Sequence, residues 1–394
     1  MKEVVLVGAC RTPIAKFQGA LSGFRAPDLG ALAIAEVLRR SGVPAAAVQE
    51  VIMGCVLQAG LGQNVARQAA IKAGIPASVG AFTVNKVCGS GLKSVMLAAQ
   101  AIRAGDADVI VAGGMESMTN APYLLPEARA GVRLGHGKLI DSMVGDGLWD
   151  IYNDFHMGIT AEMVAEKYEI TRALQDAFAA ESHRRAGEAT AAGRFDEEKF
   201  TVAIPQRKGE ALKFTTDEGI KADTTAESIA KLRPAFKPDG GSVTAANASS
   251  INDGASAVLV MSAERAAQLG CKPLARVLAY GTGGCAPEWV MMAPEQSIKS
   301  VAAKLGKKPA DFDLHEINEA FAAAAVALTR VLDLDPKKVN VNGGAVALGH
   351  PIGASGCRVL TTLLHAMKQR NAKTGMASLC LGGGNAVSLA VEAL

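Results

Sequence analysis

The stretch FTVNKVCGSGLKSVMLAAQAI, residues 82–102, joins a β-type run to an apolar-periodic helix through one cysteine and a Gly-Ser-Gly turn. Cys88 stands at the junction, where a helix begins directly after it. Unpaired backbone N–H groups and the positive end of the helix dipole favour a thiolate at such a place. Free cysteines are also among the most buried residue types. Position alone therefore leaves two interpretations open, a nucleophile or a small apolar residue at a tight corner.

The same order of turn, helix, strand and glycines recurs in the last third of the chain. Ser90-Gly91 opens a helix that ends before a strand and Gly113-Gly114. Ser355-Gly356 opens a helix that ends before a strand and Gly382-Gly383-Gly384. Short β-like runs alternate with helical stretches around both copies, which is typical of a mixed or parallel sheet covered by helices. We therefore expect an α/β fold with an internal duplication and a pseudo-twofold axis.

The middle of the chain differs from both copies, because Pro, Gly and charged residues are frequent there. We interpret residues 121–250 as an inserted loop domain. The N-terminal half then comprises residues 1–120 and 251–270, and the C-terminal half comprises residues 271–394.

Composition excludes several classes of function. The formal net charge of 394 residues is +3 and no Lys/Arg-rich tract occurs, so we expect no nucleic-acid partner. Seven scattered cysteines without a CxxC pair do not fit a disulfide framework or a structural zinc site, so we expect reduced thiols and no metal.

The sequence also predicts no membrane partner. Its longest clean apolar run, residues 320–328, falls well short of the roughly 20 residues that span a bilayer. The N-terminal EVVLVGAC is typical of a short strand rather than a signal peptide, and we expect a cytoplasmic protein.

Three further residues stand where chemistry is expected. His350 lies in NGGAVALGHPIGASG, residues 342–356, where a glycine-rich loop can hold an imidazole in one orientation. Cys380 precedes three glycines in LCLGGGNA, although a buried cysteine beside a tight turn is the plainer interpretation. Asn318 lies in HEINEAFAAA near a helix start, where an N-cap is the structural alternative.

Taken together, these blocks resemble the thiolase family of the acetyl-CoA acetyltransferase type. The shared blocks occur in the family's order and spacing: VCGSGLKSVMLAAQAI, VAGGMESMTNAPYLL, HMGITAE, NASSINDGA, NEAFAA, GGAVALGHPIGASG and CLGGG. The resemblance implies the thiolase-like duplicated five-layer αβαβα fold, with an inserted loop domain that binds coenzyme A. It also implies a homotetramer built as a dimer of dimers.

The resemblance assigns catalytic roles to individual residues. Cys88 matches the acylated nucleophile, His350 the base that activates it, and Cys380 the second acid/base. Asn318 matches the residue that holds a catalytic water, which forms one oxyanion hole together with His350. The backbone N–H groups of Cys88 and Gly382 form the other.

The resemblance also implies the substrates and the residues that bind them. Acetyl-CoA, acetoacetyl-CoA and CoA are the expected partners; because coenzyme A thioesters are themselves the substrates, no cofactor is expected. The residues that match substrate-binding positions are His156, Met157, Lys221, Ser228, Phe236, Ala245, Ser249 and Phe321.

The implied activity is that of an acyltransferase, the reversible Claisen condensation of two acetyl-CoA through acetyl-Cys88 in a ping-pong mechanism. Alternatives are a 3-ketoacyl-CoA thiolase of broader chain length, a decarboxylating β-ketoacyl synthase and a non-enzymatic coenzyme-A-binding protein. The inserted loop domain carries the sequence HMG at residues 156–158. It is compact and resembles that of short-chain biosynthetic thiolases, which favours acetoacetyl-CoA over long-chain 3-ketoacyl-CoA as substrate. The chain departs from the family pattern at MMAPEQS (291–297), Ile317, Ser250 and Ala386, and the first two affect the expected acyl-chain preference.

Overall fold

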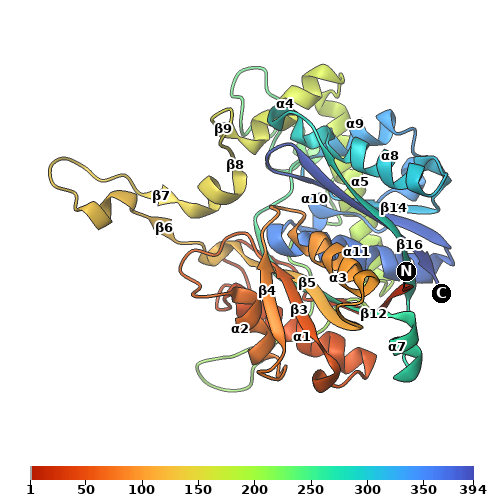
Figure 1. Cartoon of the computed structure of the whole chain (residues 1–394). Helices are drawn as coiled ribbons and strands as arrows, with labels where there is room; N and C mark the ends of the chain where they lie inside the picture. Colours follow the sequence, from red (N-terminus) through yellow and green to blue (C-terminus); the bar gives the residue numbers. More distant parts are fainter. Residues whose placement is uncertain (1) are drawn as a thin grey trace.

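The computed structural model describes residues 2–394, and two α/β halves repeat one order of elements in it (Figure 1). Besides the two-residue β2 (Ala15–Lys16), the N-terminal half contributes five strands to the central sheet, and three helices pack on them. These are β1 (Val4–Arg11), α1 (Ala26–Ser41), β3 (Glu50–Gly54), α2 (Val65–Lys72), β4 (Gly80–Val84), α3 (Ser90–Ala104), β5 (Val109–Ser117) and β12 (Asn252–Ser262).

The C-terminal half repeats this order with one strand reduced. Its elements are β13 (Ala275–Gly284), α8 (Pro294–Lys304), β14 (Leu314–Ile317), α9 (Ala322–Val331), α11 (Ile352–Arg370), β15 (Thr374–Leu381) and β16 (Asn385–Ala393). At the place of β4, residues 339–342 make only an isolated parallel bridge, between Val339 and His315. The predicted duplication is therefore visible in the order of elements.

The strands form one mixed sheet in the order β14-β15-β16-β13-β1-β12-β5-β3-β4, with β2 (Ala15–Lys16) paired to β12. The two halves join edge to edge through β1 and β13. These two strands pair over a short stretch, at Val5 with Arg276 and at Leu6 with Ala275. Parallel pairing occurs inside each half, between β3 and both β4 and β5 and between β14 and β15.

Three apolar cores lie between five layers: α1 with α2, the strands of the N-terminal half, α3 with α11, the strands of the C-terminal half, and α8 with α9. The middle core surrounds α3 and α11 and contacts the strands of both halves. In β5, Val109 and Val111 face the core under α1 and α2, whereas Ile110 and Ala112 face the core around α3 and α11. This alternation follows from the two-residue period of a strand that is buried on both faces. A third core, which includes Met376 of β15, lies under α8 and α9. The predicted five-layer αβαβα fold is confirmed.

The repeated Ser-Gly pairs explain how α3 and α11 come together in the middle layer (Figure 1). A Cβ on Gly91 would lie 2.7 Å from the backbone nitrogen of Cys357, and one on Gly356 would lie 2.3 Å from that of Leu92. Only glycine allows the two backbones to approach so closely. The first turns of both helices, and hence the loops that carry Cys88 and His350, are thereby held side by side.

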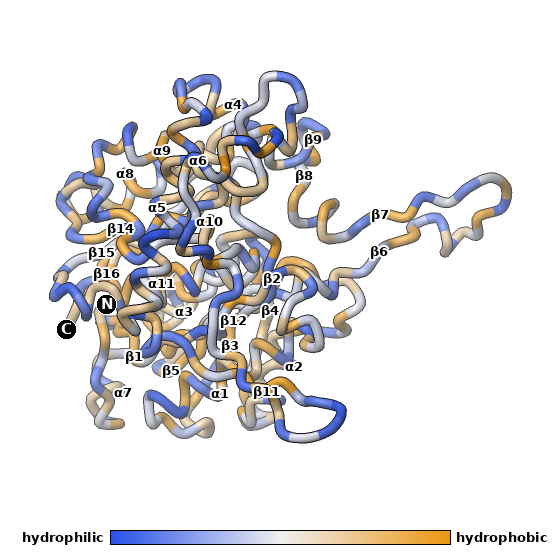
Figure 2. Tube along the Cα trace, turned by 180° about the vertical axis from the view of Figure 1, so that it is seen from behind, coloured by the Kyte–Doolittle hydropathy of each residue, from blue (hydrophilic) through white to orange (hydrophobic). Residues whose placement is uncertain are grey.

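The segment between β5 and β12 carries the remaining short elements. The hairpin of β6 (Tyr123–Leu124) and β7 (Ile140–Asp141) projects as an arm from the body in Figures 1 and 2. Helices α4 (Met157–Lys167) and α5 (Arg172–Ala191) pack on α9. The other elements of this segment are β8 (Trp149–Asp150), β9 (Phe155–His156), β10 (Val202–Ile204), β11 (Leu212–Phe214) and α6 (Ala226–Ile229).

Two short helices lie outside these groups, α7 (Ala263–Gln268) and α10 (Ala345–Leu348). None of the helices within residues 2–394 combines the length and the apolar character that a membrane crossing requires.

Candidate active site

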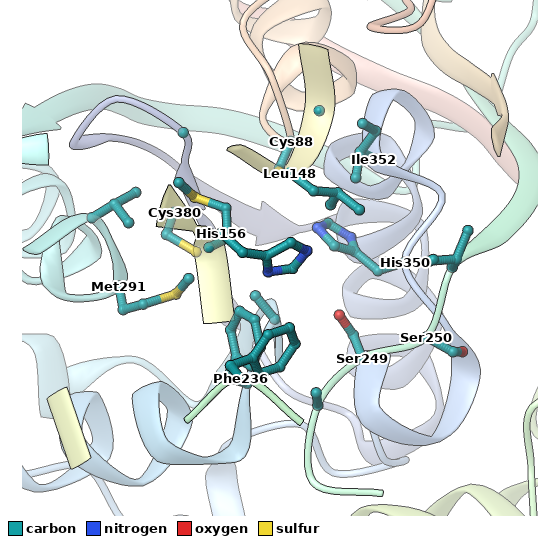
Figure 3. Close-up of a pocket in the computed structure, with 18 of the residues that line it drawn as sticks. Cys88, Leu148, His156, Phe236, Ser249, Ser250, Met291, His350, Ile352 and Cys380 are labelled. Carbon is teal, nitrogen blue, oxygen red and sulfur yellow. The ribbon is translucent and has the colours of Figure 1, made fainter. Parts of the chain in front are cut away.

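A cavity of about 360 Å³ opens where the loops of the two halves meet (Figure 3). Cys88 reaches it from the N-terminal half, His350, Cys380 and Gly382 from the C-terminal half, and His156 from the inserted segment. Four of the five predicted catalytic residues thus line one cavity, although they are spread over almost 300 positions of the sequence.

A strained turn positions Cys88. The residue before it, Val87, has φ of 45°, a left-handed conformation that is rare for a β-branched side chain. Ser90 holds this turn, since its hydroxyl donates to the Val87 carbonyl oxygen at 2.6 Å and accepts from the Lys86 N–H at 2.8 Å. Such local strain persists only where neighbouring structure enforces it, and it is common at active sites.

Desolvation of its sulfur keeps Cys88 as a thiol, although the residue as a whole is only half-buried. Removal from water raises its pKa above the ordinary value, and the nearby Cys380 acts in the same direction. The backbone N–H groups of Cys88 and Gly382 face the sulfur and lower the pKa, but their effect is smaller. The helix N-terminus, which favours a thiolate, is therefore outweighed by desolvation, and Cys88 needs a base.

His350 can act as that base. Its Nδ1 lies 2.6 Å from the hydroxyl of Ser355, which donates its single hydrogen to the Pro351 carbonyl oxygen at 2.9 Å. With the Ser355 hydrogen directed to Pro351, the tautomer protonated at Nδ1 completes the hydrogen bond to Ser355, and Nε2 has no hydrogen-bond partner within residues 2–394. Burial, aided by the charge of Arg358, lowers the pKa of His350 to about 3, so the ring is neutral with a free lone pair.

Cys380 lies near the end of β15, and the glycines after it turn the chain toward β16. Gly383 and Gly384 have φ of +81° and +77°, and a Cβ on Gly384 would lie 2.2 Å from the Cys285 carbonyl oxygen. This turn brings the Gly382 N–H to the sulfur of Cys88. Burial raises the pKa of Cys380 to about 12, so this second sulfur is also a thiol.

Asn318, the fifth predicted catalytic residue, does not line the cavity within the described part of the chain. It is not an N-cap, since α9 begins after Phe321. Its Oδ1 accepts a 3.4 Å hydrogen bond from Nη2 of the buried Arg358, and among residues 2–394 its Nδ2 has no partner. Arg358 thereby orients the amide so that its N–H₂ group is free to donate.

An aromatic wall forms another side of the cavity (Figure 3). The rings of His156 and Phe236 stack with centroids 4.7 Å apart, and Phe321 meets Phe236 edge-on at 6.1 Å. Gly158 is required beneath them, because a Cβ there would lie 2.2 Å from the Phe236 ring. The predicted binding residues that line the cavity are His156, Met157, Phe236, Ala245, Ser249 and Phe321.

Two predicted binding residues lie elsewhere. Lys221 lines a neighbouring cavity of about 450 Å³, which shares Ala245 with the first and also contains Lys16, a residue that sequence reasoning missed. Ser228 belongs to a capping box at the start of α6, where its N–H donates to Oγ1 of Thr225 at 3.2 Å. Among the described residues it lines neither of these two cavities.

Several lining residues carried no signal in the sequence. They are apolar side chains that no role assignment from the sequence singled out: Met118, Leu148, Val290 and Ile352. Of the departures from the family pattern, Ser250 and Met291 line the cavity, whereas Ile317 and Ala386 are buried within strands. Residues 2–394 contain no group of three or more His, Cys, Asp or Glu side chains arranged to hold a metal ion.

Comparison with protein families gives two matches that together span nearly the whole chain. Residues 4–264 match the family model described as "Thiolase, N-terminal domain", and residues 271–393 match "Thiolase, C-terminal domain".

Individual proteins are similar over the same length. An "Acetyl-CoA acetyltransferase" of Pseudomonas aeruginosa is 58% identical over 389 residues, which cover 99% of each chain. A protein of the same name from Cupriavidus necator is 57% identical over 392 residues and 100% of each chain. The crystal structure of the Bacillus anthracis acetyl-CoA acetyltransferase superposes with a TM-score of 0.97 at 43% identity, covering 100% of this chain and 99% of that one.

Proposed function

The chain belongs to the thiolase family, and from this premise we propose that it is an acetyl-CoA C-acetyltransferase, which condenses two acetyl-CoA reversibly to acetoacetyl-CoA and CoA. One observation carries the proposal. The thiols of Cys88 and Cys380 and the unpaired imidazole nitrogen of His350 line the same cavity.

The first half-reaction transfers an acetyl group to Cys88. Nε2 of His350 takes the thiol proton while the sulfur attacks the thioester carbonyl carbon. The bond from carbon to the sulfur of CoA then breaks, and the departing sulfur takes the proton of Cys380. This step converts Cys380, which burial keeps protonated at rest, into a thiolate base.

The second half-reaction forms the carbon–carbon bond. Cys380 removes an α-proton from the second acetyl-CoA, and its enolate oxygen is stabilised by the protonated Nε2 of His350 with a water held by Asn318. The α-carbon attacks acetyl-Cys88, and the backbone N–H groups of Cys88 and Gly382 stabilise the resulting oxyanion. The Cys88 sulfur leaves and regains its proton from His350, so that protons balance over the cycle and no metal or cofactor takes part.

The coenzyme A moiety occupies both cavities in this proposal. The pantetheine arm passes the aromatic wall and Ser249, while the phosphates lie toward the neighbouring cavity. Lys221 and Lys16 supply positive charge there.

The assembly and its location complete the proposal. A homotetramer, arranged as a dimer of dimers, is supported by the arm between β6 and β7, which exposes large apolar side chains. Leu134 is 98% exposed, and Leu139 and Tyr123 are also exposed. Such an apolar surface indicates a protein interface. We propose the cytoplasm as the location.

The test is thiolysis of acetoacetyl-CoA by free CoA. Appearance of two acetyl-CoA per substrate consumed, with a labelled acetyl group recovered on the Cys88 peptide after quenching, is the expected result. A folded protein that binds CoA without turnover would indicate a binding protein, and preference for a malonyl thioester as carbon donor would indicate a decarboxylating synthase.

A further inference from the structure

We infer that the cavity has two apolar walls that select different parts of the substrate. One wall, formed around Leu148, limits the length of the acyl group carried by Cys88. The other, formed by Met291, limits substitution at the α-carbon of the CoA-bound group. This inference rests on the proposed function.

The two sulfurs belong to different apolar clusters. Cys88 packs against the cluster of Met118 and Ile352, to which Leu148 also contributes. Cys380 belongs to a separate cluster with Val290 and Met291. Figure 3 shows the same division, with Leu148 and Ile352 on the Cys88 side and Met291 on the Cys380 side.

The reaction assigns each wall a part of the substrate. In thiolysis of a 3-ketoacyl-CoA, the Cys88 sulfur bonds to C3, the C2–C3 bond breaks, and C2 takes the proton of Cys380. Any chain beyond C3 therefore moves with the acyl group to the Cys88 side. Any branch on C2 lies beside Cys380, where Met291 is.

Met291 closes the space beside Cys380. It lies in the last turn of a short 3₁₀ helix, Pro287–Met292, and is only 3% exposed while lining the cavity. A methyl branch on C2 would have to displace its thioether. Met292 is a matched neighbour, because it is buried in the same cluster but does not line the cavity among the described residues.

Two variants and two substrates separate the walls. Thiolysis of 2-methylacetoacetyl-CoA reports a branch at C2, and thiolysis of 3-ketohexanoyl-CoA reports a longer acyl group on Cys88. We expect Met291→Ala to raise kcat/KM for the branched substrate, relative to acetoacetyl-CoA, roughly tenfold or more, because a misfit of one methyl group changes selectivity by that order. We expect Leu148→Ala to do so for 3-ketohexanoyl-CoA, with each variant leaving the other ratio within about threefold of wild type.

Met292→Ala is the control for general loosening of the core, and both wild-type ratios should persist in it. Acceptance of the longer rather than the branched substrate by Met291→Ala, or equal gains in Met291→Ala and Met292→Ala, would overturn the assignment of the walls. Unchanged ratios in folded Met291→Ala and Leu148→Ala would also overturn it. Absence of acetoacetyl-CoA thiolysis in the wild-type protein would instead refute the proposed function.

Discussion

The backbone N–H of Gly353 donates a 2.8 Å hydrogen bond to Oε2 of Glu116, so that the loop of His350 is tied to β5 of the other half. The same carboxyl group accepts from the N–H groups of Val56 and Leu57, at 3.0 and 3.2 Å. One buried side chain thus fixes two loops of different halves beside the cavity.

Titration of Glu116 should make stability depend on pH. Burial raises the pKa of this carboxyl to about 7 from 4.5, although its three N–H donors oppose the rise. Between these values the folded protein holds a proton that the unfolded chain releases, so the free energy of unfolding falls as pH rises from about 4.5 to 7, by up to about 3 kcal/mol. Glu116→Gln should remove this part of the slope in denaturant unfolding at several pH values and fixed protein concentration. A slope equal to that of wild type would show that Glu116 does not titrate there.

Loss of the Ser355 hydroxyl should impair catalysis through the tautomer of His350. Without that acceptor at 2.6 Å, the proton is no longer held on Nδ1, and part of the population has Nε2 protonated and unable to take the Cys88 proton. We expect Ser355→Ala to slow single-turnover acetylation of Cys88 by about tenfold or more. Ser297→Ala, which removes a buried hydroxyl bonded to Ser388 away from the cavity, should acetylate at the wild-type rate. Equal rates in the two variants would argue against the positioning role.

The sequence predicted the reacting side chains of the site but not the buried charged side chains that hold them. Cys88, His350 and Cys380 stand beside glycines that make turns and close backbone approaches, which local sequence reveals. Arg358 and Glu116 gave no such signal, because a charged residue in a helix or strand is ordinarily assigned to solvent and only the packing of two halves buries them.

The apolar wall around Leu148 could not be predicted from the sequence for a related reason. Leu148 and Ile352 are single aliphatic residues beside glycines, and a single aliphatic residue is equally typical of a core. Only the tertiary structure therefore separates side chains that line the cavity from side chains that pack in the core. Lys221 and Ser228 show the opposite limit, since matching a motif did not place them in the main cavity.

The pH profile should lack an acid limb from His350 near neutrality. Its imidazole must be neutral to accept the Cys88 proton, and burial lowers its pKa to about 3. Protonation would therefore remove activity only as pH falls toward that value, well below the ordinary range of histidine. The rate constant of Cys88 acetylation should stay within about twofold between pH 5.5 and 7.5. A decline in this rate constant with an apparent pKa near 6.5 would be tested again in Glu116→Gln. If the decline is absent from that variant, it belongs to the Glu116 carboxyl. If the decline persists in that variant, it contradicts a neutral, buried imidazole at His350.

The two thiols should separate when each is replaced. Cys380→Ala lacks the base for the α-carbon, so condensation should fall by about a thousandfold or more, whereas acetyl-Cys88 still accumulates because CoA can depart as a thiolate. Cys88→Ala should lose both steps, since it has no nucleophile. Acetylation is followed by mass spectrometry of the quenched Cys88 peptide, and condensation by acetoacetyl-CoA formed. Cys285→Ala is the control, because this thiol lies beside the glycine turn but does not line the cavity among the described residues. If Cys380→Ala condensed acetyl-CoA at a rate near that of Cys285→Ala, another group would have to remove the α-proton. The role of Cys380 as the base for the α-carbon would then be wrong.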